Sequence, residues 1–423
     1  MKQVAALEIS NRCYKLVIGY VLDNKINIIY KTKRPLSVPF KDGDIFDIGS
    51  LSDDLNKINA FEIDGDTHKL KVKINEVALI LPSYGLEVYK CQKTTNTVSN
   101  VSKIDKIDIS NALALVKKEK LPNPNNILVD IVPNKFIIDG NKEYVMPPLN
   151  EISQTITIDT NVYTLPSKMI TDMKKACEKA GIRVKRDVIA PIGVAQLLAG
   201  LKFKYQTYVL VDISSKTTTL SFIGKNTVYS SNFFSLGIAD LTDKYITDFN
   251  ISREKADEVR NLYGFDQRKL DYNPTIIESI NADGETKRYT KEDLNNSTNA
   301  FLKTWISWFS GSFKSLLEQY PSLLTNIPLV LIGEGTKLNG LKDYMLRTFN
   351  SNPLEVISLP IVGCRDNEYA NCLSAIYVSY SYRGALEDDN KLHVSELNRI
   401  TDSSSTREKV KERDKYSELH DEL

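Results

Sequence analysis

The sequence predicts a two-domain α/β fold made of a duplicated unit, and three observations carry this prediction. The segments AALEIS and YVLVDIS each end a strand near a carboxylate, Glu8 in the first and Asp212 in the second. In both, a short polar turn follows and a second strand returns, as in an antiparallel hairpin. A third segment, IPLVLIGEGTKLNGLKDYML, has the pattern of a buried strand, a turn with Gly333 and Gly335, and a helix. The repeated hairpin and the strand–turn–helix segment together indicate an internal duplication.

The other elements follow from hydrophobic periodicity and turn residues, in chain order. The first thirty residues alternate as a three-stranded antiparallel meander, and EVALILP is a later strand. SKMITDMKKACEKAGI is predicted to be a helix that Gly181 ends, and APIGVAQLLAGLK is predicted to be the next helix. Residues 105–119 are also predicted to be helical, and four apolar residues define one side of that helix: Ile107, Ala112, Leu115 and Val116.

Composition excludes several classes of function. The chain has 423 residues with 55 basic and 54 acidic side chains, so it lacks the basic excess of a dedicated nucleic-acid binder. No apolar run is long enough to span a membrane, and no export signal opens the chain, so we expect a cytoplasmic protein. Five scattered cysteines favour reduced thiols over a disulfide framework or a zinc site. The only histidines are His68, His393 and His420, which leaves little from which to build a histidine-dependent nucleophile.

The segment FLKTWISWFSGSFKSLLEQY is amphipathic and holds both tryptophans of the chain. Such a helix could lie on a membrane surface. It directly precedes the PLVLIG strand, where the fold needs a helix that covers the sheet, so a core helix is the favoured interpretation. Six large apolar side chains are predicted near its buried face: Phe301, Trp305, Trp308, Phe309, Phe313 and Leu316.

The two predicted hairpins have the chemistry of a nucleotide clamp. A carboxylate at a bend can hold a magnesium-bound water, and the backbone N–H groups of the turn can face a phosphate. Two such turns that point at each other would hold a nucleotide tail from both sides. A strand followed by a Gly-x-Gly turn, as at Gly333 and Gly335, can lie close to an adenosine, because glycine lets the backbone approach.

With these motifs in this order, the sequence resembles the bacterial actin-like proteins and, among them, the FtsA family of cell-division proteins. AALEIS resembles the first phosphate loop, YVLVDISSKTTTLSF the second, and VLIGEGTKLNGL the adenosine loop. ILVDIVPNKFIIDG, with Pro147 after it, is similar to the subdomain that FtsA carries in place of a standard actin subdomain. ISREKADEVRNLYG resembles the FtsA helix on the adenosine side, and DNEYANCLSAIY the C-terminal helix of the family. The resemblance implies an actin-like (ribonuclease H-like, duplicated) two-domain α/β fold with an FtsA-type inserted subdomain.

The resemblance also implies a division into subdomains. Residues 1–75 and 160–196 would form the first actin-like subdomain, and residues 76–159 the inserted one. Residues 197–240 and 301–385 would form the second actin-like subdomain, with 241–300 as its small companion. Residues 386–423 are charged and low in large apolar side chains, and we expect them to be a solvated, disordered tail.

ATP and Mg²⁺ are the ligands that the resemblance implies, with Asp212 as the metal-associated carboxylate. The nucleotide-binding positions that it implies lie in both loops, on the ISREKADEVR helix and in the glycine turn: Glu8, Ser10, Asn11, Asp212, Ser214, Ser215, Lys216, Thr217, Asp257, Arg260, Gly333 and Gly335.

The loops depart from the family pattern where phosphate would lie. The family's Asp-x-Gly-Thr is here Glu-Ile-Ser-Asn, and its Asp-x-Gly-Gly-Gly-Thr-Thr-Asp is Asp-Ile-Ser-Ser-Lys-Thr-Thr-Thr. The added Cβ atoms crowd a phosphate, and Thr219 replaces an acid that would help to hold a metal-bound water. Lys216 either contacts the phosphate directly or is solvated. These losses account for part of the low glycine content, 19 residues, against roughly 30 at average usage. We expect at most a weak ATPase, and a non-catalytic protein is favoured.

For partners, the resemblance implies the C-terminal peptide of the tubulin-like protein FtsZ and self-association into actin-like filaments. The peptide would bind residues 241–300, where Arg253, Lys255 and the segment from Asn295 to Asn299 are candidates. The tail has neither the aromatic face nor the positive charge of a lipid-binding helix. We therefore expect indirect membrane contact at the division site, on the inner face of the membrane, through other division proteins. Two alternatives stay open: an ATPase of the actin–chaperone superfamily, and an adaptor like the pilus-assembly protein PilM.

Overall fold

The computed structural model describes residues 3–22, 25–64, 69–99, 101–266, 272–280, 284–318, 320 and 326–381. These residues form two compact units. Unit 1 includes Met1–Tyr84 and Met169–Val378, and unit 2 includes Gly85–Lys168. The predicted tail and all three histidines lie outside the described residues.

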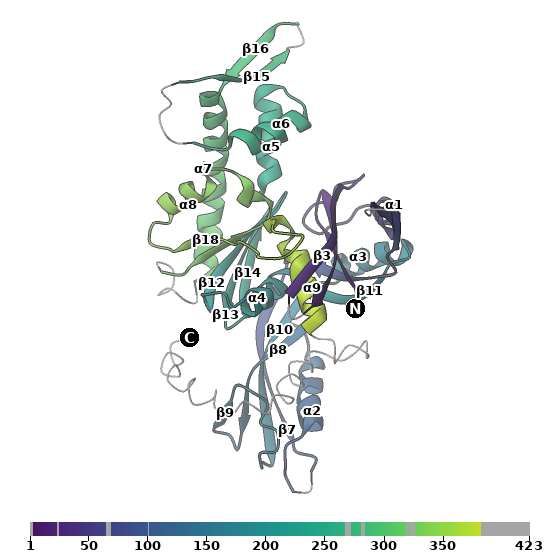
Figure 1. Ribbon diagram of the computed structural model, residues 1–423. Coiled ribbons are helices and arrows are strands. Elements are labelled where there is room, and N and C mark those ends of the chain that lie inside the picture. The colour runs from purple at the N-terminus through teal and green to yellow at the C-terminus, as the bar shows by residue number, and fades with distance from the viewer. Residues whose placement is uncertain are drawn as a thin grey trace. The chain divides into compact units, whose positions relative to one another are not determined.

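Unit 1 contains two five-stranded sheets with the same topology (Figure 1). In each sheet, three antiparallel strands form a meander, and two further strands pair in parallel beside its first strand. The first sheet has the order β11-β6-β1-β2-β3, with β1 (Val4–Ile9), β2 (Cys13–Leu22), β3 (Lys25–Pro35), β6 (Glu76–Leu81) and β11 (Arg183–Ile189). The second has the order β14-β13-β12-β17-β18, with β12 (Thr207–Ile213), β13 (Thr218–Gly224), β14 (Thr227–Phe234), β17 (Leu329–Ile332) and β18 (Leu354–Val356). The duplication predicted from the two hairpins is confirmed.

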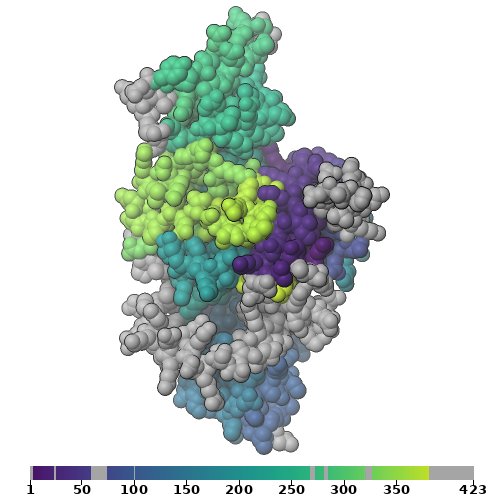
Figure 2. All heavy atoms as spheres, viewed as in Figure 1, coloured from purple at the N-terminus to yellow at the C-terminus, as the bar shows by residue number. Residues whose placement is uncertain are grey.

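Helices and short hairpins complete unit 1. The helices are α1 (Ile48–Asn59), α3 (Ser167–Lys179), α4 (Ala190–Gly200), α5 (Ile238–Phe249), α6 (Arg253–Tyr263), α7 (Lys291–Leu316), α8 (Leu341–Thr348) and α9 (Ala370–Ser381), with 3-10 turns η2 (Glu334–Lys337) and η3 (Asn367–Tyr369). Two-stranded sheets pair β4 (Ala60–Asp64) with β5 (Lys69–Lys73) and β15 (Thr275–Ile280) with β16 (Thr286–Thr290). Figure 2 shows the C-terminal part of unit 1, in yellow-green, against the N-terminal strands in purple, in agreement with the bridge between Asn27 and Val362.

The aromatic segment forms the second half of α7, which packs on β13 and β14. Trp305 and Phe309 are fully buried, and the indole N–H of Trp305 donates to Thr218 Oγ1 at 2.9 Å, so the core role is confirmed. The assignment of Trp308 to the buried face is wrong, because its side chain is 57% exposed. A residue three positions after Trp305 is rotated about 60° around the helix axis, and this turns Trp308 away from the sheet.

Unit 2 is a four-stranded sheet with one helix. Its order is β7-β10-β8-β9, with β7 (Glu87–Asn96), β8 (Asn126–Ile138), β9 (Lys142–Tyr144) and β10 (Thr155–Pro166), and α2 (Lys106–Lys117) packs on β7 and β10. The predicted apolar side of α2 is partly wrong: Ile107 and Leu115 are exposed. The buried apolar residues are instead Ile109, Ala112, Leu113 and Val116, spaced as one helix face. Asp108 is buried beside them, where its carboxylate accepts from the N–H groups of Val98 and Asp105.

One strand lies outside the subdomain that was predicted to contain it. Strand β6, placed with the inserted subdomain at residues 76–159, pairs with β1 and β11 in the first sheet. The compact unit 2 accordingly includes Gly85–Lys168, a range that starts and ends later in the chain. None of the described helices is both long and apolar enough to cross a lipid bilayer.

Candidate functional site

Two equivalent hairpin loops lie at the centre of unit 1. In the first loop (residues 10–13), Ser10 N donates to Cys13 O at 2.9 Å; in the second loop (residues 214–217), Ser214 N donates to Thr217 O at 2.9 Å. The strand registers also match, because Glu8 pairs with Lys15 and Asp212 pairs with Thr219. The duplication thus places a carboxylate two residues before each loop, at the end of a buried strand.

The first carboxylate has a buried partner. Lys15 Nζ donates to Glu8 Oε2 at 3.2 Å and to Glu368 O at 2.7 Å, and both charged side chains are more than nine-tenths buried. Burial is the largest single influence and disfavours the ammonium, but Glu8 and after it Cys13, Cys372 and Asp212 together outweigh burial and hold the pKa of Lys15 well above its ordinary value. The charge of Glu8 is therefore compensated within the protein.

Among the residues that the structure describes, the second carboxylate, Asp212, accepts hydrogen bonds from neutral side chains only. Asn371 Nδ2 lies 3.0 Å from Asp212 Oδ2 and 2.9 Å from Glu8 Oε1, and so bridges the two acids, while Ser214 Oγ donates to Asp212 Oδ1 at 3.0 Å. Burial, and after it the neighbouring Glu8 charge, raise the pKa of Asp212 above its ordinary value. The folded structure therefore disfavours the charged form of Asp212, and acids with a perturbed pKa are common at ligand sites.

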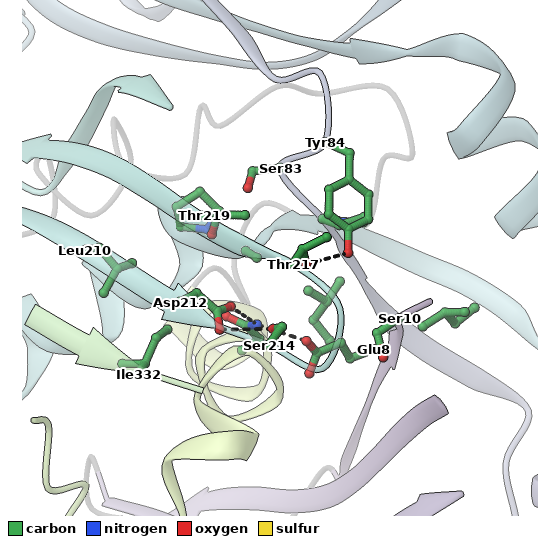
Figure 3. A pocket seen from close by; sticks show the side chains of 16 residues that line it. Glu8, Ser10, Ser83, Tyr84, Leu210, Asp212, Ser214, Thr217, Thr219 and Ile332 are labelled. Carbon is green, nitrogen blue, oxygen red and sulfur yellow. Dashed lines mark hydrogen bonds between the residues drawn. The ribbon is translucent and has the colours of Figure 1, made fainter. Parts of the chain in front are cut away.

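A small cavity of about 30 Å³ lies between the two carboxylates (Figure 3). Tyr84, whose hydroxyl is 3.1 Å from Thr217 Oγ1, and Thr219 contribute to its wall, together with Glu8, Ser10, Asp212, Ser214 and Asn371. A cavity needs about 10–15 Å³ of such volume for each water. The space suits about two waters and is too small for a nucleotide.

The backbone of both loops offers hydrogen-bond donors. Among the described residues, the N–H groups of Asn11, Arg12, Ser215 and Lys216 have no protein acceptor. The carbonyl groups of the second loop are used instead, because Ser214 O and Ser215 O accept from the first N–H groups of α5 at 3.0 and 2.7 Å. Successive free N–H groups of this kind form a concavity that favours anions.

The loop cations are engaged by acids of α5. Arg12 Nη2 lies 2.9 Å from Asp243 Oδ2, and Lys216 Nζ lies 2.5 Å from the same oxygen and also contacts Asp240. Arg253 is 2.5 Å from Asp243 Oδ1. Although burial opposes ionisation, Lys216, Arg253 and Arg12 lower the pKa of Asp243 to about 2. Lys216 is therefore ion-paired rather than freely solvated, and its predicted contact with a phosphate stays a prediction.

The glycine turn lies directly on the second loop's strand. Gly333 has φ +90°, and an added Cβ would lie 2.4 Å from Asp212 Oδ1 and 2.6 Å from Ile213 O. A Cβ at Gly335 would lie 2.2 Å from Ile213 Cγ2. Both positions thus need glycine for close packing on β12, whatever ligand binds beside them.

The two predicted residues of α6 join this turn rather than the cavity. Arg260 is buried and contacts Asp257 Oδ1 at 3.1 Å and Glu334 Oε1 at 3.4 Å. Glu334 also pairs with Lys33 of β3 at 2.8 Å. This ion pair joins the two halves of unit 1, that is, the part built on the first five-stranded sheet and the part built on the second. Lys33 and Arg260 outweigh burial and lower the pKa of Glu334.

The structure thus brings most of the predicted positions together. The cavity is lined by Glu8, Ser10, Asp212, Ser214 and Thr217, and the two loops also contain Asn11, Ser215 and Lys216. The glycine turn packs against Asp212 and Ile213 through Gly333 and Gly335. The two residues of α6 are linked to this turn, because Arg260 contacts Glu334 and pairs with Asp257.

Sequence reasoning missed several residues of the site, among them Lys15, Asp243 and Asn371. Lys15 could have been predicted from the sequence, because a two-residue turn at positions 11 and 12 places it opposite Glu8. Asp243 and Asn371 could not, since their partners are far away in the sequence.

The donor set fits a phosphate with a divalent cation. Glu8, Asp212 and Asn371 supply oxygens of the kind that Mg²⁺ prefers, and the four free loop N–H groups suit phosphate oxygens. Within the described residues, no group of three or more His, Cys, Asp or Glu side chains could hold a metal ion by itself. Any such cation would therefore take ligands from water and from the phosphate as well.

Sequence comparison relates the chain to cell-division proteins. No family model matches it. It is 22% identical to the cell division protein FtsA of Staphylococcus epidermidis (strain RP62A) over 418 residues, which cover 94% of this chain and 86% of the relative. It is 20% identical to FtsA of Bacillus subtilis (strain 168) over 371 residues, 86% of this chain and 80% of that protein. The resemblance to FtsA is confirmed, and these relatives indicate an actin-like protein of cell division.

Structure comparison gives the fold. A chain of the PilM-PilN type IV pilus biogenesis complex matches with a TM-score of 0.58 and 18% identity, over 88% of this chain and 97% of that one. MreB 5 of Spiroplasma citri bound to AMPPNP matches with a TM-score of 0.53 and 12% identity, over 92% and 98% of the two chains. The predicted actin-like α/β fold is confirmed.

Proposed function

We propose that this protein is a non-catalytic scaffold of cell division that works as FtsA-type proteins do. It binds the C-terminal peptide of FtsZ through residues 241–300 and assembles into actin-like filaments. The observation that carries the proposal is the match to FtsA relatives over about nine-tenths of the chain, on a fold with both duplicated sheets. Its place would be the cytoplasmic side of the division site, which it reaches through other division proteins.

We further propose that ATP with Mg²⁺ binds between the two loops. Glu8, Asp212 and the free loop N–H groups would face the phosphates, and Gly333, Gly335, Asp257 and Arg260 would lie toward the adenosine. When bound, Mg²⁺ would neutralise part of the phosphate charge. Thr219, opposite Asp212, supplies no carboxylate for a metal-bound water, so hydrolysis is at most weak. The closed cavity supports binding that needs an opening motion.

Within residues 241–300, contacts separate the peptide-site candidates. Arg253 is held by Asp243, and Ser297 and Thr298, inside the Asn295 to Asn299 segment, are buried. Lys255 keeps a partly exposed side chain, and within the described residues its ion pair is with Glu258, one helical turn away at 3.0 Å. Lys255 is therefore the candidate that an acidic peptide reaches most easily.

The test is binding of the organism's own FtsZ C-terminal peptide, measured by fluorescence anisotropy. Wild type is expected to bind the peptide, and Lys255→Glu is expected to bind it at least several-fold more weakly. Lys142→Glu reverses an equal charge in unit 2 and is expected to bind as wild type does. A sequence-scrambled peptide is the second control. No measurable binding of the native peptide to wild type would overturn the scaffold proposal.

A PilM-like adaptor that holds the peptide of a membrane-anchored pilus protein is the second candidate. The match to the PilM-PilN complex is the observation that supports it. Pulldown from the native organism distinguishes the two: FtsZ is the expected partner of the scaffold, and recovery of a single-span pilus protein without FtsZ would reverse the order.

A further inference from the structure

The two loops carry cations at equivalent positions, and both cations meet acids of one helix. Arg12 and Lys216 each stand third in their loop, and both contact Asp243 of α5. Arg12 belongs to the first sheet's hairpin, whereas α5 follows the second sheet's meander. The Arg12–Asp243 pair therefore ties the two halves of unit 1 together next to the candidate phosphate site.

The charges of this cluster leave it open to an incoming anion. Three cations, Arg12, Lys216 and Arg253, surround two acids, Asp240 and Asp243. The side chains of the two loop cations and the two acids are 20–32% exposed, so solvent and small solutes reach them. Carboxylates and phosphates compete for the same donors, because both are anionic acceptors with similar hydrogen-bond geometry.

We propose that Asp240 and Asp243 form an internal carboxylate latch that takes the place of a phosphate at the two loops and limits nucleotide binding. The proposal rests on the proposed nucleotide site and adds its regulation. With the latch closed, Arg12 and Lys216 are neutralised by α5 and the two sheets are held together. A nucleotide must displace these carboxylates before its phosphates reach the loop cations.

The structure shows why α5 is suited to this task. Its first residues follow Gly237, where a Cβ would lie 2.5–2.7 Å from Ser214 O, Ser215 O and Lys216 N. The start of α5 therefore lies directly on the second loop, and its acids cannot be far from Lys216. Asp240 Oδ2 also accepts from Gly237 N at 2.7 Å, so it helps to begin the helix. Within the described residues, the Asp243 carboxylate accepts no hydrogen bond from a backbone N–H, so its substitution leaves the start of α5 intact. Asp243 is therefore the better position for a test.

Other contacts keep the two halves together when the latch is removed. Lys33 pairs with Glu334, Tyr84 is hydrogen-bonded to Thr217, and Ser235 Oγ donates to Asp42 Oδ2 at 2.6 Å. Asp243→Asn keeps the shape of the side chain and is expected to fold. Asp248→Asn is the matched control, because Asp248 lies on the same helix and contacts Lys244 and Ser297 instead of the loops.

The experiment is isothermal titration of the full-length protein with three probes: Mg-ATP, inorganic tripolyphosphate and adenosine. Asp243→Asn is expected to bind Mg-ATP and tripolyphosphate about tenfold more tightly than wild type, since one charge-assisted competitor is gone. Adenosine, which has no phosphate, is expected to bind all variants equally. Asp248→Asn is expected to match wild type with every probe, and circular dichroism checks that each variant is folded.

The outcomes separate the latch from the nucleotide site. If wild type and Asp243→Asn bind Mg-ATP with equal affinity, the latch is wrong and the nucleotide site stands. If no variant binds at millimolar concentration, the nucleotide site is wrong and the latch falls with it, whereas peptide binding still decides the scaffold role. Tighter binding of adenosine as well as tripolyphosphate would also overturn the latch, because the gain would then come from general opening.

Discussion

The two sheets of unit 1 share their strand order and their hairpins, and they differ in what faces the carboxylate. In the first sheet, Glu8 stands opposite Lys15 and forms a buried ion pair. In the second, Asp212 stands opposite Thr219; within the described residues it forms no ion pair, and its hydrogen-bond donors, Asn371 and Ser214, are neutral. The same topology thus holds one compensated acid and one uncompensated acid about an amide bridge, Asn371. The repeated pattern gives the two sheets one fold, and the residue opposite each carboxylate, Lys15 or Thr219, is one position at which the repeats diverge.

The largest expected effect comes from breaking the compensated pair. Lys15→Met leaves Glu8 buried without its counter-charge and is expected to lower the free energy of unfolding by about 3–5 kcal/mol. Because the pKa of Lys15 is raised by folding, its contribution is fully present at pH 7 and is lost only as pH rises through that pKa. Urea denaturation at pH 7 measures the loss.

The equivalent change in the second sheet is the control for this prediction. Thr219→Val removes a hydroxyl from the position that matches Lys15, and we expect a cost of no more than about 1 kcal/mol. The double variant Lys15→Met with Glu8→Gln should recover much of the lost stability, since the buried charge is gone. Equal losses for Lys15→Met and Thr219→Val would contradict the asymmetry.

The next largest effect on stability is expected at the glycine turn. This turn follows β17 of the second sheet, and the first sheet has no glycine at the equivalent position. After β17 comes Gly333 at φ +90°, whereas Pro82 follows the equivalent strand β6. Gly333→Ala forces a Cβ toward Asp212 and Ile213 in a conformation that disfavours side chains, and we expect a loss of about 1–3 kcal/mol. Thermal unfolding followed by circular dichroism measures the change.

Gly311→Ala is the matched control for the glycine turn. Gly311 lies within α7, and a Cβ there meets nothing within 4 Å. Alanine is the better helix former, so this variant should gain about 0.5–1 kcal/mol. The two Gly→Ala changes are expected to have opposite signs, and a stabilising Gly333→Ala would remove the argument for close packing on β12.

Sequence alone predicted the parts of this molecule that depend on local pattern. Alternating strands and short polar turns predict both hairpins. The Glu8–Lys15 pairing was missed, although a two-residue turn at residues 11 and 12 implies it. The ion-paired state of Lys216 could not be predicted, because Asp240 and Asp243 reach it only through the packing of α5 at Gly237. Asn371 is 363 positions from Glu8, and no local pattern connects them.

In α2, sequence reasoning chose the wrong apolar stripe. The buried residues Ile109, Ala112, Leu113 and Val116 keep the helical period, and beside them the buried carboxylate of Asp108 accepts from the N–H groups of Val98 and Asp105, a polar contact that sequence reasoning missed. The same kind of contact decides the site, where ion pairs rather than loop composition determine which groups face a ligand. Composition predicted crowding by Cβ atoms at the loops, but the competition by carboxylates has no compositional signal.

The smallest effect tests the uncompensated acid directly. Because folding raises the pKa of Asp212, its contribution to stability is present at low pH and is lost as pH rises above the unfolded value near 4. Asp212→Asn should therefore stabilise the ligand-free protein at pH 7, on the order of 1 kcal/mol, with no gain near pH 3.

Asp243 is the best comparison for Asp212, because folding shifts their pKa values in opposite directions. The pKa of Asp243 is lowered to about 2. Its stabilisation is present above about pH 4 and fades as pH falls toward 2. Asp243→Asn should therefore lose stability at pH 7, about 1 kcal/mol after allowance for solvent screening. Two Asp→Asn changes in one site with opposite signs at pH 7 would show that one acid supports the ligand-free fold while the other opposes it. If both variants lose stability at pH 7, then Asp212 is as well compensated as Glu8, and the two sheets do not differ in the way that their registers imply.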